Sequence, residues 1–270
     1  MDNNRERHKT LMDNLYSTEK YPDAVALWAS FFAKGKDEIE YSNWRHLNKK
    51  RQDIENDVWE RFISKGSKIL EIGCGEGFFL KRVYSNFGDS INYNGIDISS
   101  EAINCAKKFF RNAKYICSEA EKLPFKNENF DYVQIISTLE HVIDVRATLK
   151  EAYRILKKNG YLYIVIHKNS IDPLLMSTIY FKLKNLFRKK KKIDTQCYSK
   201  PLVSVRGKMF KTIEELGLRK IENRSLIPNM SIAFYRKLHI QLKLLIWIGD
   251  IINNIPISIF KNLEYFVYQK

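Results

Sequence analysis

The pattern of apolar and polar positions divides the chain into three stretches. Residues 1–60 are polar and read as helical, with aromatic side chains scattered among them. From Lys68 to His167, short β-rich apolar runs alternate with amphipathic runs of helical period. After His167 the pattern is looser, and apolar helix-like stretches and two further strand-like stretches are separated by basic segments.

The middle stretch predicts a regular alternation of strands and helices, and Asn159-Gly160 predicts where its last helix stops. Such an alternation indicates a doubly wound α/β fold with a mostly parallel sheet, whose ligands bind at the carboxyl ends of the strands. The strands are expected at Lys68–Gly73, Tyr93–Ile98, Lys114–Cys117, Phe130–Ser137, Tyr161–His167, Leu218–Leu226 and Leu263–Gln269. The helices are expected at Phe78–Phe87, Ser99–Phe110, Asp144–Lys158 and Ser204–Gly217.

The composition is that of a folded protein in a reducing compartment. Hydrophobic residues make up 44% and charged residues 29% of the 270 residues. The N-terminus has no apolar signal-peptide core, and polar residues break the longest apolar stretch, Leu238–Phe260, too often for a membrane span. The cysteines have no metal-binding spacing and are too few for a disulfide framework. They are Cys74, Cys105, Cys117 and Cys197.

A glycine-rich turn follows the first strand, in the segment Glu71-Ile-Gly-Cys-Gly-Glu-Gly77. Glycines let the backbone turn tightly and approach a ligand closely. The turn is similar to the dinucleotide fingerprint, but its third glycine comes two residues after the second instead of three. Glu71 would also repel a pyrophosphate and favour a ligand that carries an ammonium group. These details weigh against NAD.

Two further acids follow the next two strands. Asp97 ends the second strand, where a carboxylate can accept hydrogen bonds from both ribose hydroxyls. Glu119 follows the third strand, within Ser118–Phe125, where an acidic side chain and backbone groups can meet an adenine edge. Each acid alone is as readily a solvated loop residue or a helix cap. Three acids in order at strand ends are difficult to assign to chance.

With these motifs the sequence resembles the class I S-adenosylmethionine-dependent methyltransferases. The resemblance covers residues 66–167 and rests on ILEIGCGEG, NGIDIS, EAEKLPFKNENFDYV, LEHV and LKEAYRILKKNGYLYIV in succession. In style these motifs are closest to small-molecule, quinone or lipid methyltransferases of the methyltransferase domain 11 type. The resemblance implies a Rossmann-like, seven-stranded sheet with an antiparallel last strand, for which Leu263–Gln269 is the candidate.

The resemblance also implies S-adenosylmethionine as the cofactor and suggests roles for individual residues. Asp97 would bind the ribose hydroxyls, Ile98 would pack on the adenine, and Ser137 would lie beside the sulfonium. The loop around the methionine part of the cofactor would be formed by Glu71, Gly73, Cys74, Gly75 and Gly77, and the adenine edge would be met by Glu119 and Ala120.

Four regions follow from this interpretation. We expect residues 1–60 to form an N-terminal helical cap and residues 61–167 to form the Rossmann-like core that binds the cofactor. Residues 168–231 would be a substrate-side insertion that continues the fold, and residues 232–270 an amphipathic helical segment with the final strand. The first and third regions should supply the acceptor pocket. Candidate lid residues are Tyr16, Tyr21, Tyr41 and Trp44, although ordinary packing of the cap is the favoured interpretation of these side chains.

His141, in the segment LEHV, is the candidate general base. Methyl transfer from a sulfonium is an in-line displacement that gains mainly from alignment, and a base helps only where the acceptor must lose a proton. An imidazole can take that proton near neutral pH, although His141 could instead cap a turn or pack under the cofactor. His167 is a weaker second candidate. Glu140-His141 also resembles a metal-associated segment of quinone O-methyltransferases, but Ser137 stands where that segment has a further glutamate, so no metal is predicted.

Missing motifs narrow the acceptor. The segment after the fourth strand lacks the Pro-Pro-aromatic motif of nucleobase amino-methylation, and the chain has no Pro-Cys nucleophile for cytosine C5 methylation. Nucleic acid is therefore not expected as the partner. We expect a small, lipid-linked or envelope-precursor metabolite as the acceptor, with O-methylation slightly favoured over N- or C-methylation.

The net charge of +15 is concentrated in one part of the chain. Residues 1–60 carry −2, residues 61–167 carry +4 and residues 168–270 carry +13. Seven basic residues and no acid lie between Lys182 and Lys192. Segments 180–192 and 232–260 could thus lie on an anionic membrane surface, at the inner membrane face of a cytoplasmic enzyme. A solvated loop is the alternative.

Two rival functions stay open. An RNA methyltransferase would bind phosphates through the basic region, although the aromatic–basic interleaving of known RNA modules is missing. A non-catalytic scaffold with this fold would not need Glu71, the three glycines and Asp97, which are all present. The leading interpretation is therefore an S-adenosylmethionine-dependent methyltransferase.

Overall fold

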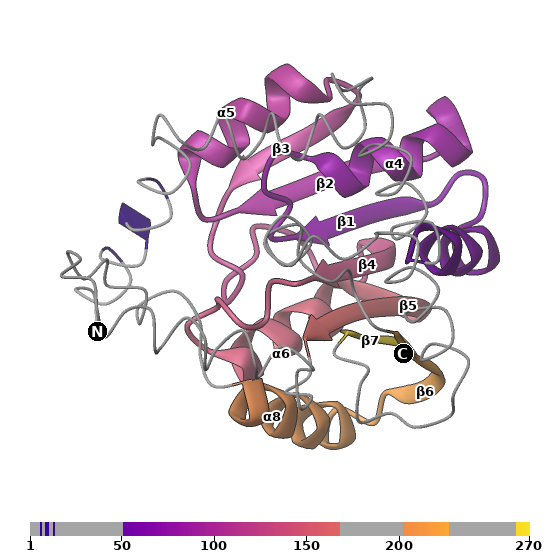
Figure 1. Ribbon diagram of the computed structural model, residues 1–270, viewed down its shortest axis with the longest axis vertical. Coiled ribbons are helices and arrows are strands. Elements are labelled where there is room, and N and C mark those ends of the chain that lie inside the picture. Colours follow the sequence, from indigo (N-terminus) through magenta and orange to yellow (C-terminus); the bar gives the residue numbers. More distant parts are fainter. Residues whose placement is uncertain (1–5, 7–8, 11–12, 14–50, 168–201, 227–262) are drawn as a thin grey trace, which may run out of the picture.

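A computed structural model of the chain describes residues 6, 9, 10, 13, 51–167, 202–226 and 263–270 (Figure 1). Residues 51–62 form a helix, which precedes an alternation of strands and further helices. The strands are β1 (Lys68–Ile72), β2 (Asn92–Asp97), β3 (Ala113–Cys117), β4 (Phe130–Ile136), β5 (Leu156–His167), β6 (Arg219–Leu226) and β7 (Leu263–Gln269). The helices are α4 (Phe78–Phe87), α5 (Ser100–Phe109), α6 (Val145–Ile155) and α8 (Leu202–Glu215), with a short 3-10 turn, η1, at Gly88–Ser90.

The seven strands form one sheet in the order β3-β2-β1-β4-β5-β7-β6. Strands β1 to β5 are parallel to one another, so their carboxyl ends lie along one edge of the sheet. Strand β7 is antiparallel to both β5 and β6 and lies between them. The expected Rossmann-like sheet, with Leu263–Gln269 as an inserted antiparallel strand, is therefore confirmed.

Helices cover both faces of the sheet (Figure 1). Helix 51–62, α4 and α5 pack on one face, where Trp59, Leu80 and Ile103 belong to a single buried cluster with sheet residues. Helices α6 and α8 pack on the other face, where Leu149 and Met209 belong to a second cluster. The sheet is thus buried on both sides, as a doubly wound fold requires.

Local signals explain where α5 and α6 begin. The Ser99 hydroxyl accepts a hydrogen bond from the Ala102 N–H at 3.1 Å and caps α5. The Asp144 carboxylate accepts bonds from the N–H groups of Arg146 and Ala147 and caps α6. Both helices therefore start close to the edge of the sheet at which β2 and β4 end.

The predicted end of α6 is wrong. The sequence predicted a helix as far as Lys158, but α6 ends at Ile155 and β5 begins at Leu156. Leu156 pairs with Phe130 of β4, and the Asn129 N–H donates to the Ile155 carbonyl at 2.7 Å. This pairing overrides the helical pattern, and Asn159, at φ 61°, lies within the strand instead of ending the helix.

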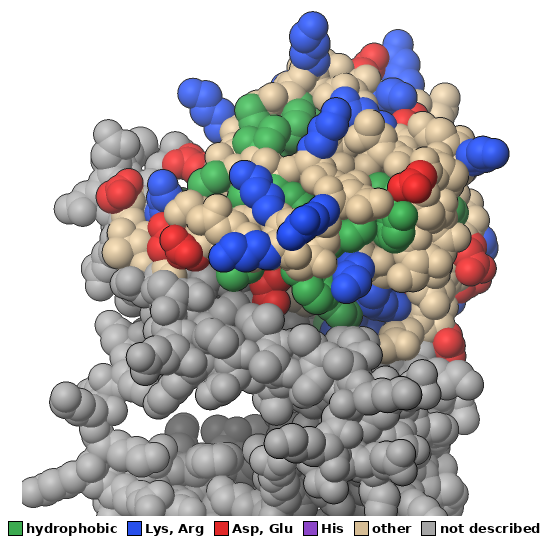
Figure 2. Space-filling view, turned by 90° about the horizontal axis from the view of Figure 1, so that it is seen from above, with side chains coloured by type: hydrophobic (Ala, Val, Ile, Leu, Met, Phe, Trp, Pro, Cys, Tyr) green, Lys and Arg blue, Asp and Glu red, His purple; other side chains and the backbone are tan. Residues whose placement is uncertain are grey.

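The described surface of the core carries exposed basic side chains. Figure 2 shows the face on which α5 and β3 lie, with blue Lys and Arg side chains scattered among apolar ones. Lys107, Lys108, Arg111 and Lys114 are exposed on or beside these two elements. Within the described part of the chain, every helix is too short or too polar to cross a membrane. Segments 180–192 and 232–260, predicted to meet a membrane surface, lie outside the described residues.

Candidate functional site

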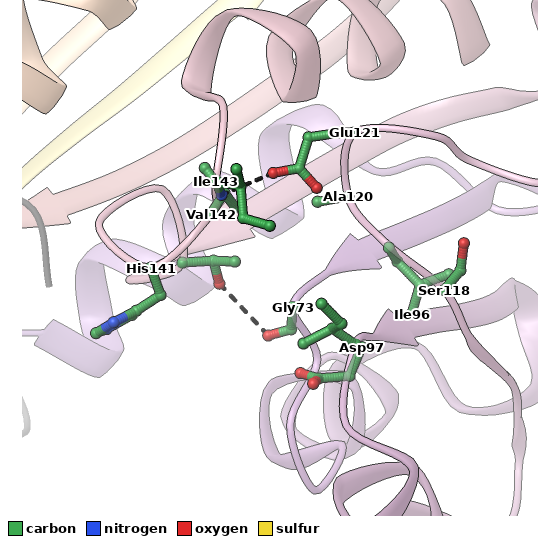
Figure 3. A pocket seen from close by; sticks show the side chains of 11 residues that line it. Gly73, Ile96, Asp97, Ser118, Ala120, Glu121, His141, Val142 and Ile143 are labelled. Carbon is green, nitrogen blue, oxygen red and sulfur yellow. Dashed lines mark hydrogen bonds between the residues drawn. The ribbon is translucent and has the colours of Figure 1, made fainter. Parts of the chain in front are cut away.

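A pocket opens at the carboxyl edge of the sheet, where the loops after β1, β2, β3 and β4 meet (Figure 3). Each loop contributes to its wall, so the pocket lies where the strand-end rule expects a ligand. The lining residues are Gly73, Ile96, Asp97, Ile98, Ser118, Ala120, Glu121, Thr138, His141, Val142 and Ile143.

Asp97, the last residue of β2, is the buried carboxylate of this pocket, with 6% of its surface exposed. Its Oδ2 accepts a hydrogen bond from the Gly75 N–H and its Oδ1 accepts one from the Ser99 N–H, both at 2.9 Å. Burial raises the pKa of Asp97, and the backbone N–H groups oppose that rise by stabilising the anion. A carboxylate can accept about four hydrogen bonds, so Asp97 retains capacity for two donors from a ligand.

The glycine turn after β1 has no room for side chains at two of its positions. A Cβ on Gly73 would lie 2.2 Å from the Thr138 Cγ2, and a Cβ on Gly77 would lie 2.4 Å from the Tyr115 hydroxyl oxygen. Both glycines also have positive φ angles, 74° and 78°, which L-residues adopt at a cost. The turn therefore brings bare backbone to the pocket. Cys74 is buried and does not line the pocket.

Glu71 lies beneath the pocket and not in its wall. Its side chain is 1% exposed, and its Oε2 has no hydrogen-bond partner among the described residues. Burial raises the pKa of Glu71 well above the usual carboxyl range, the Gln134 amide opposes the rise, and the charge of Asp97 adds to it. A cation bound nearby would reverse this cost, which fits a ligand that carries an ammonium group.

The loop after β4 forms the opposite wall. Ser137 has a φ of 50°, and its N–H donates to the Val165 carbonyl at 2.8 Å. The next residue, Thr138, lines the pocket, and its hydroxyl donates to the Ile136 carbonyl at 3.0 Å. His141 also lines the pocket, but its ring is directed away from Gly73 and Asp97 (Figure 3).

The structure thus brings some predicted residues together and leaves others aside. Gly73, Asp97, Ile98, Ala120 and His141 line the pocket. The predicted residues outside its wall are Glu71, Cys74, Gly75, Gly77, Glu119 and Ser137. The His167 side chain and the candidate lid residues Tyr16, Tyr21, Tyr41 and Trp44 lie outside the described part of the chain.

The pocket wall also contains four residues that the sequence did not indicate, Glu121, Thr138, Val142 and Ile143. Thr138, Val142 and Ile143 lie just after β4, so the strand-end rule could have found them. Glu121 stands two residues from the predicted Glu119, and spacing alone does not indicate which of the two faces the pocket. Among the described residues, no three or more His, Cys, Asp or Glu side chains are arranged to hold a metal ion.

Similarity to known proteins agrees with this geometry. Residues 70–164 match a family model described as a methyltransferase domain. A ubiquinone/menaquinone biosynthesis C-methyltransferase of Rickettsia prowazekii is 38% identical over 103 residues, which are 35% of this chain and 42% of that protein. A demethylmenaquinone methyltransferase of Staphylococcus aureus is 31% identical over 125 residues, which are 44% of this chain and 52% of that protein. The chain spans about half the length of the curated relatives it matches.

Solved structures share the fold. The [4+2]-cyclase SpnF superposes with a TM-score of 0.53 at 15% identity and covers 81% of each chain. The MccD protein superposes with a TM-score of 0.52 at 18% identity, over 80% of this chain and 96% of that one. These likenesses concern the fold alone, because one fold supports several reactions. On the family match, the relatives and the fold together, residues 70–164 form a methyltransferase domain of the class I S-adenosylmethionine-dependent type.

Proposed function

We propose that this protein transfers the methyl group of S-adenosylmethionine to a small organic acceptor. The observation that carries the proposal is Asp97, a buried carboxylate with spare acceptor capacity beside a bare glycine turn. A ribose offers two neighbouring hydroxyl donors, which match that capacity. The match of residues 70–164 to a methyltransferase domain supports the same cofactor.

The remaining wall residues suit the other parts of this cofactor. Ile98, Ala120 and Val142 offer apolar surface for the adenine. The backbone at Gly73 would lie along the methionine part, and Glu71 below it would favour the ammonium group, directly or through water. The side chains of Glu119 and Ser137 do not line the pocket. We therefore propose that the backbone of the Glu119 loop meets the adenine edge and that the backbone at Ser137 lies beside the sulfonium.

Bound S-adenosylmethionine supplies an electrophilic methyl group, so the protein contributes chiefly alignment. Gly73 and the loop after β4 would hold the cofactor at the carboxyl edge of the sheet. His141 is the proposed general base for an acceptor that must lose a proton, after a rotation of its ring toward the pocket. An acceptor that is already ionised would not need it.

For the acceptor we propose a small molecule with a quinone-type ring. Support comes from two relatives whose names concern ubiquinone and menaquinone. The sequence slightly favours oxygen as the methylated atom, whereas the name of the Rickettsia relative specifies carbon. Analysis of the methylated product by NMR distinguishes these outcomes. The lipid linkage of the acceptor and the contact with an anionic membrane stay predictions.

Calorimetric titration with S-adenosylhomocysteine tests the proposal. Wild-type protein should bind it, and Asp97→Ala should lose at least about 100-fold in affinity, because hydrogen bonds to a charged group contribute about 1.5–3 kcal/mol each. Glu101→Ala is the matched control, since Glu101 is an exposed carboxylate in the first turn of α5. The proposal fails if wild-type protein does not bind, or if Asp97→Ala binds as tightly as Glu101→Ala.

A further inference from the structure

We propose that Glu121 is a positioning residue that holds two opposite walls of the cofactor pocket together. The loop after β3 supplies one wall through Ser118, Ala120 and Glu121. The loop after β4 supplies the other through Thr138 and residues 141–143. The inference rests on the proposed function, because it concerns how the same pocket keeps its shape.

The bridge between the walls is a single carboxylate oxygen. Oε1 of Glu121 accepts hydrogen bonds from the Ile143 N–H at 2.7 Å and from the Asp144 N–H at 3.0 Å. Figure 3 shows the carboxylate reaching from the Ala120 side to the Ile143 backbone. Hydrogen bonds of this kind, from backbone N–H groups to a charged acceptor, are about twice as strong as neutral ones.

The same loop is also fastened to α6 at a second point, away from the pocket. The Leu123 N–H donates to the Glu151 carboxylate at 2.7 Å. Arg154 donates to the carbonyls of Phe125 and Leu123 at 2.7 and 3.1 Å, and it pairs with Glu151. Both fastenings hold the loop to α6 or to the residues just before it, but only that of Glu121 lies at the pocket.

Glu121 therefore acts through the backbone that carries His141 and Val142. Without its carboxylate, the N–H groups of Ile143 and Asp144 lose their acceptor, and the wall that carries His141 is free to move from the wall that carries Ala120. A pocket with separable walls binds its ligand less tightly, because the ordering of the walls must then occur on binding. The effect should appear mainly in cofactor affinity and in KM for S-adenosylmethionine, and less in kcat.

Two substitutions separate this role from others. Both hydrogen bonds go to one oxygen, so Glu121→Gln can keep them with its amide oxygen, whereas Glu121→Met cannot. We expect Glu121→Met to weaken S-adenosylhomocysteine binding and raise KM for S-adenosylmethionine about tenfold, and Glu121→Gln to change either by less than about threefold. The matched control is Arg154→Met, which removes the hydrogen bonds of Arg154 to the carbonyls of Leu123 and Phe125 and should lower stability while affinity stays within about threefold of wild type.

Amide hydrogen exchange of the cofactor-free protein provides a readout that does not depend on activity. Glu121→Met should accelerate exchange at Ile143 and Asp144, and Glu121→Gln should not. The inference is overturned if Glu121→Met leaves exchange and affinity unchanged, or if Glu121→Gln loses as much affinity as Glu121→Met. Wild-type protein that binds no cofactor would instead overturn the proposed function, and the exchange rates would still decide whether Glu121 holds the walls.

Discussion

The two faces of the central sheet bury different kinds of side chain. The cluster beneath α6 and α8 is mostly aliphatic, with Leu149 and Ile155 fully buried. The cluster beneath helix 51–62, α4 and α5 includes Trp59 and several tyrosines, and the polar side chains of Glu71 and Gln134 are buried on this side of the sheet. Several polar atoms on this second face have no hydrogen-bond partner among the described residues, whereas the first cluster has one such atom, the Tyr268 hydroxyl oxygen. Those on the second face belong to Glu71, Tyr115, Tyr132, Gln134, Tyr163 and Tyr265.

This difference indicates that one face of the sheet serves mainly stability, whereas the other also serves the cofactor pocket. Buried polar atoms without partners cost stability, so the second face is not packed for stability alone. It lies under the glycine turn, and α4 begins directly after Gly77. Proteins tolerate such costs mainly where a site needs them. We therefore expect substitutions beneath α6 to change stability alone, and substitution of Glu71 beneath α4 to change stability and cofactor binding in opposite directions.

The largest effect on stability is expected for substitution of Leu149, in the mostly aliphatic cluster beneath α6 and α8. Leu149→Ala removes a fully buried side chain and leaves a cavity, which should lower the free energy of unfolding by about 3 kcal/mol. Cofactor affinity of the folded protein should stay unchanged, because Leu149 does not line the pocket. Urea denaturation measures the loss, with Lys150→Ala on the exposed side of α6 as the control. If Leu149→Ala lowered the free energy of unfolding by less than about 1 kcal/mol, the cluster beneath α6 would not be the one packed mainly for stability.

A smaller loss of stability is expected for substitution of Glu55, which is fully buried on the side of the sheet covered by helix 51–62, α4 and α5. Its carboxylate pairs with Arg51 and Arg82, so Glu55→Ala leaves two guanidinium groups without their partner. Both arginines are partly exposed, at 19% and 16%, and water can solvate them in part. The free energy of unfolding should therefore fall by about 2 kcal/mol, below the value for a fully buried pair.

The pH dependence of that loss provides the check. Burial raises the pKa of Glu55, but the charges and hydrogen bonds of Arg51 and Arg82 outweigh burial and lower it. A lowered pKa contributes stability above the ordinary carboxyl pKa, and that stability disappears as the pH falls through the lowered value. The difference between wild type and Glu55→Ala should shrink in acid. A difference that is constant with pH would contradict the ionised pair.

Glu71→Gln should raise stability and weaken cofactor binding. The pKa of Glu71 is raised in the folded state, so its contribution to stability is present below the ordinary carboxyl pKa and is lost as the pH rises through the raised value. Glutamine does not ionise, so the variant should be about 1 kcal/mol more stable at alkaline pH, with affinity for S-adenosylhomocysteine reduced about tenfold. Thermal unfolding over a pH series and calorimetric titration test both parts. Unchanged affinity would remove Glu71 from the site.

The smallest effect is expected for Tyr163→Phe. The Tyr163 hydroxyl is buried and has no hydrogen-bond partner among the described residues. The ring of Tyr163 stacks on that of Tyr265, with 6.3 Å between the ring centroids. Phenylalanine keeps the ring and removes the hydroxyl, so stability should rise by up to about 1 kcal/mol. Chemical denaturation beside wild type measures the change. A marked loss would mean that the hydroxyl has a partner, such as an internal water.

Much of the fold could be predicted because local signals and long-range pairing agree. Leu263–Gln269 forms β7 with the predicted bounds, since its strand propensity is matched by partners on both sides. The end of α6 could not be predicted, because Lys157 and Lys158 continue the helical pattern while the pairing with β4 starts at Leu156. The local sequence around Leu156 does not show where β4 lies, and it is β4 that makes Leu156 the start of a strand.

The candidate site divides in the same way. Asp97 and Gly73 could be found because their chemistry depends on a short motif at one strand end. Glu121 could not, because its partners lie 22 and 23 residues farther along the chain, after another strand. Its function as a hydrogen-bond acceptor is visible only once the loops after β3 and β4 are brought together.

Strand β7 comes last of the seven along the chain, yet it lies inside the sheet, between β5 and β6. During synthesis on the ribosome, β5 and β6 are therefore made well before the strand that joins them. Until residues 263–269 emerge, β5 presents an unpaired edge, which is a site for association with other chains. Folding of the parallel half can begin early, but β6 joins the sheet only after translation has passed residue 269.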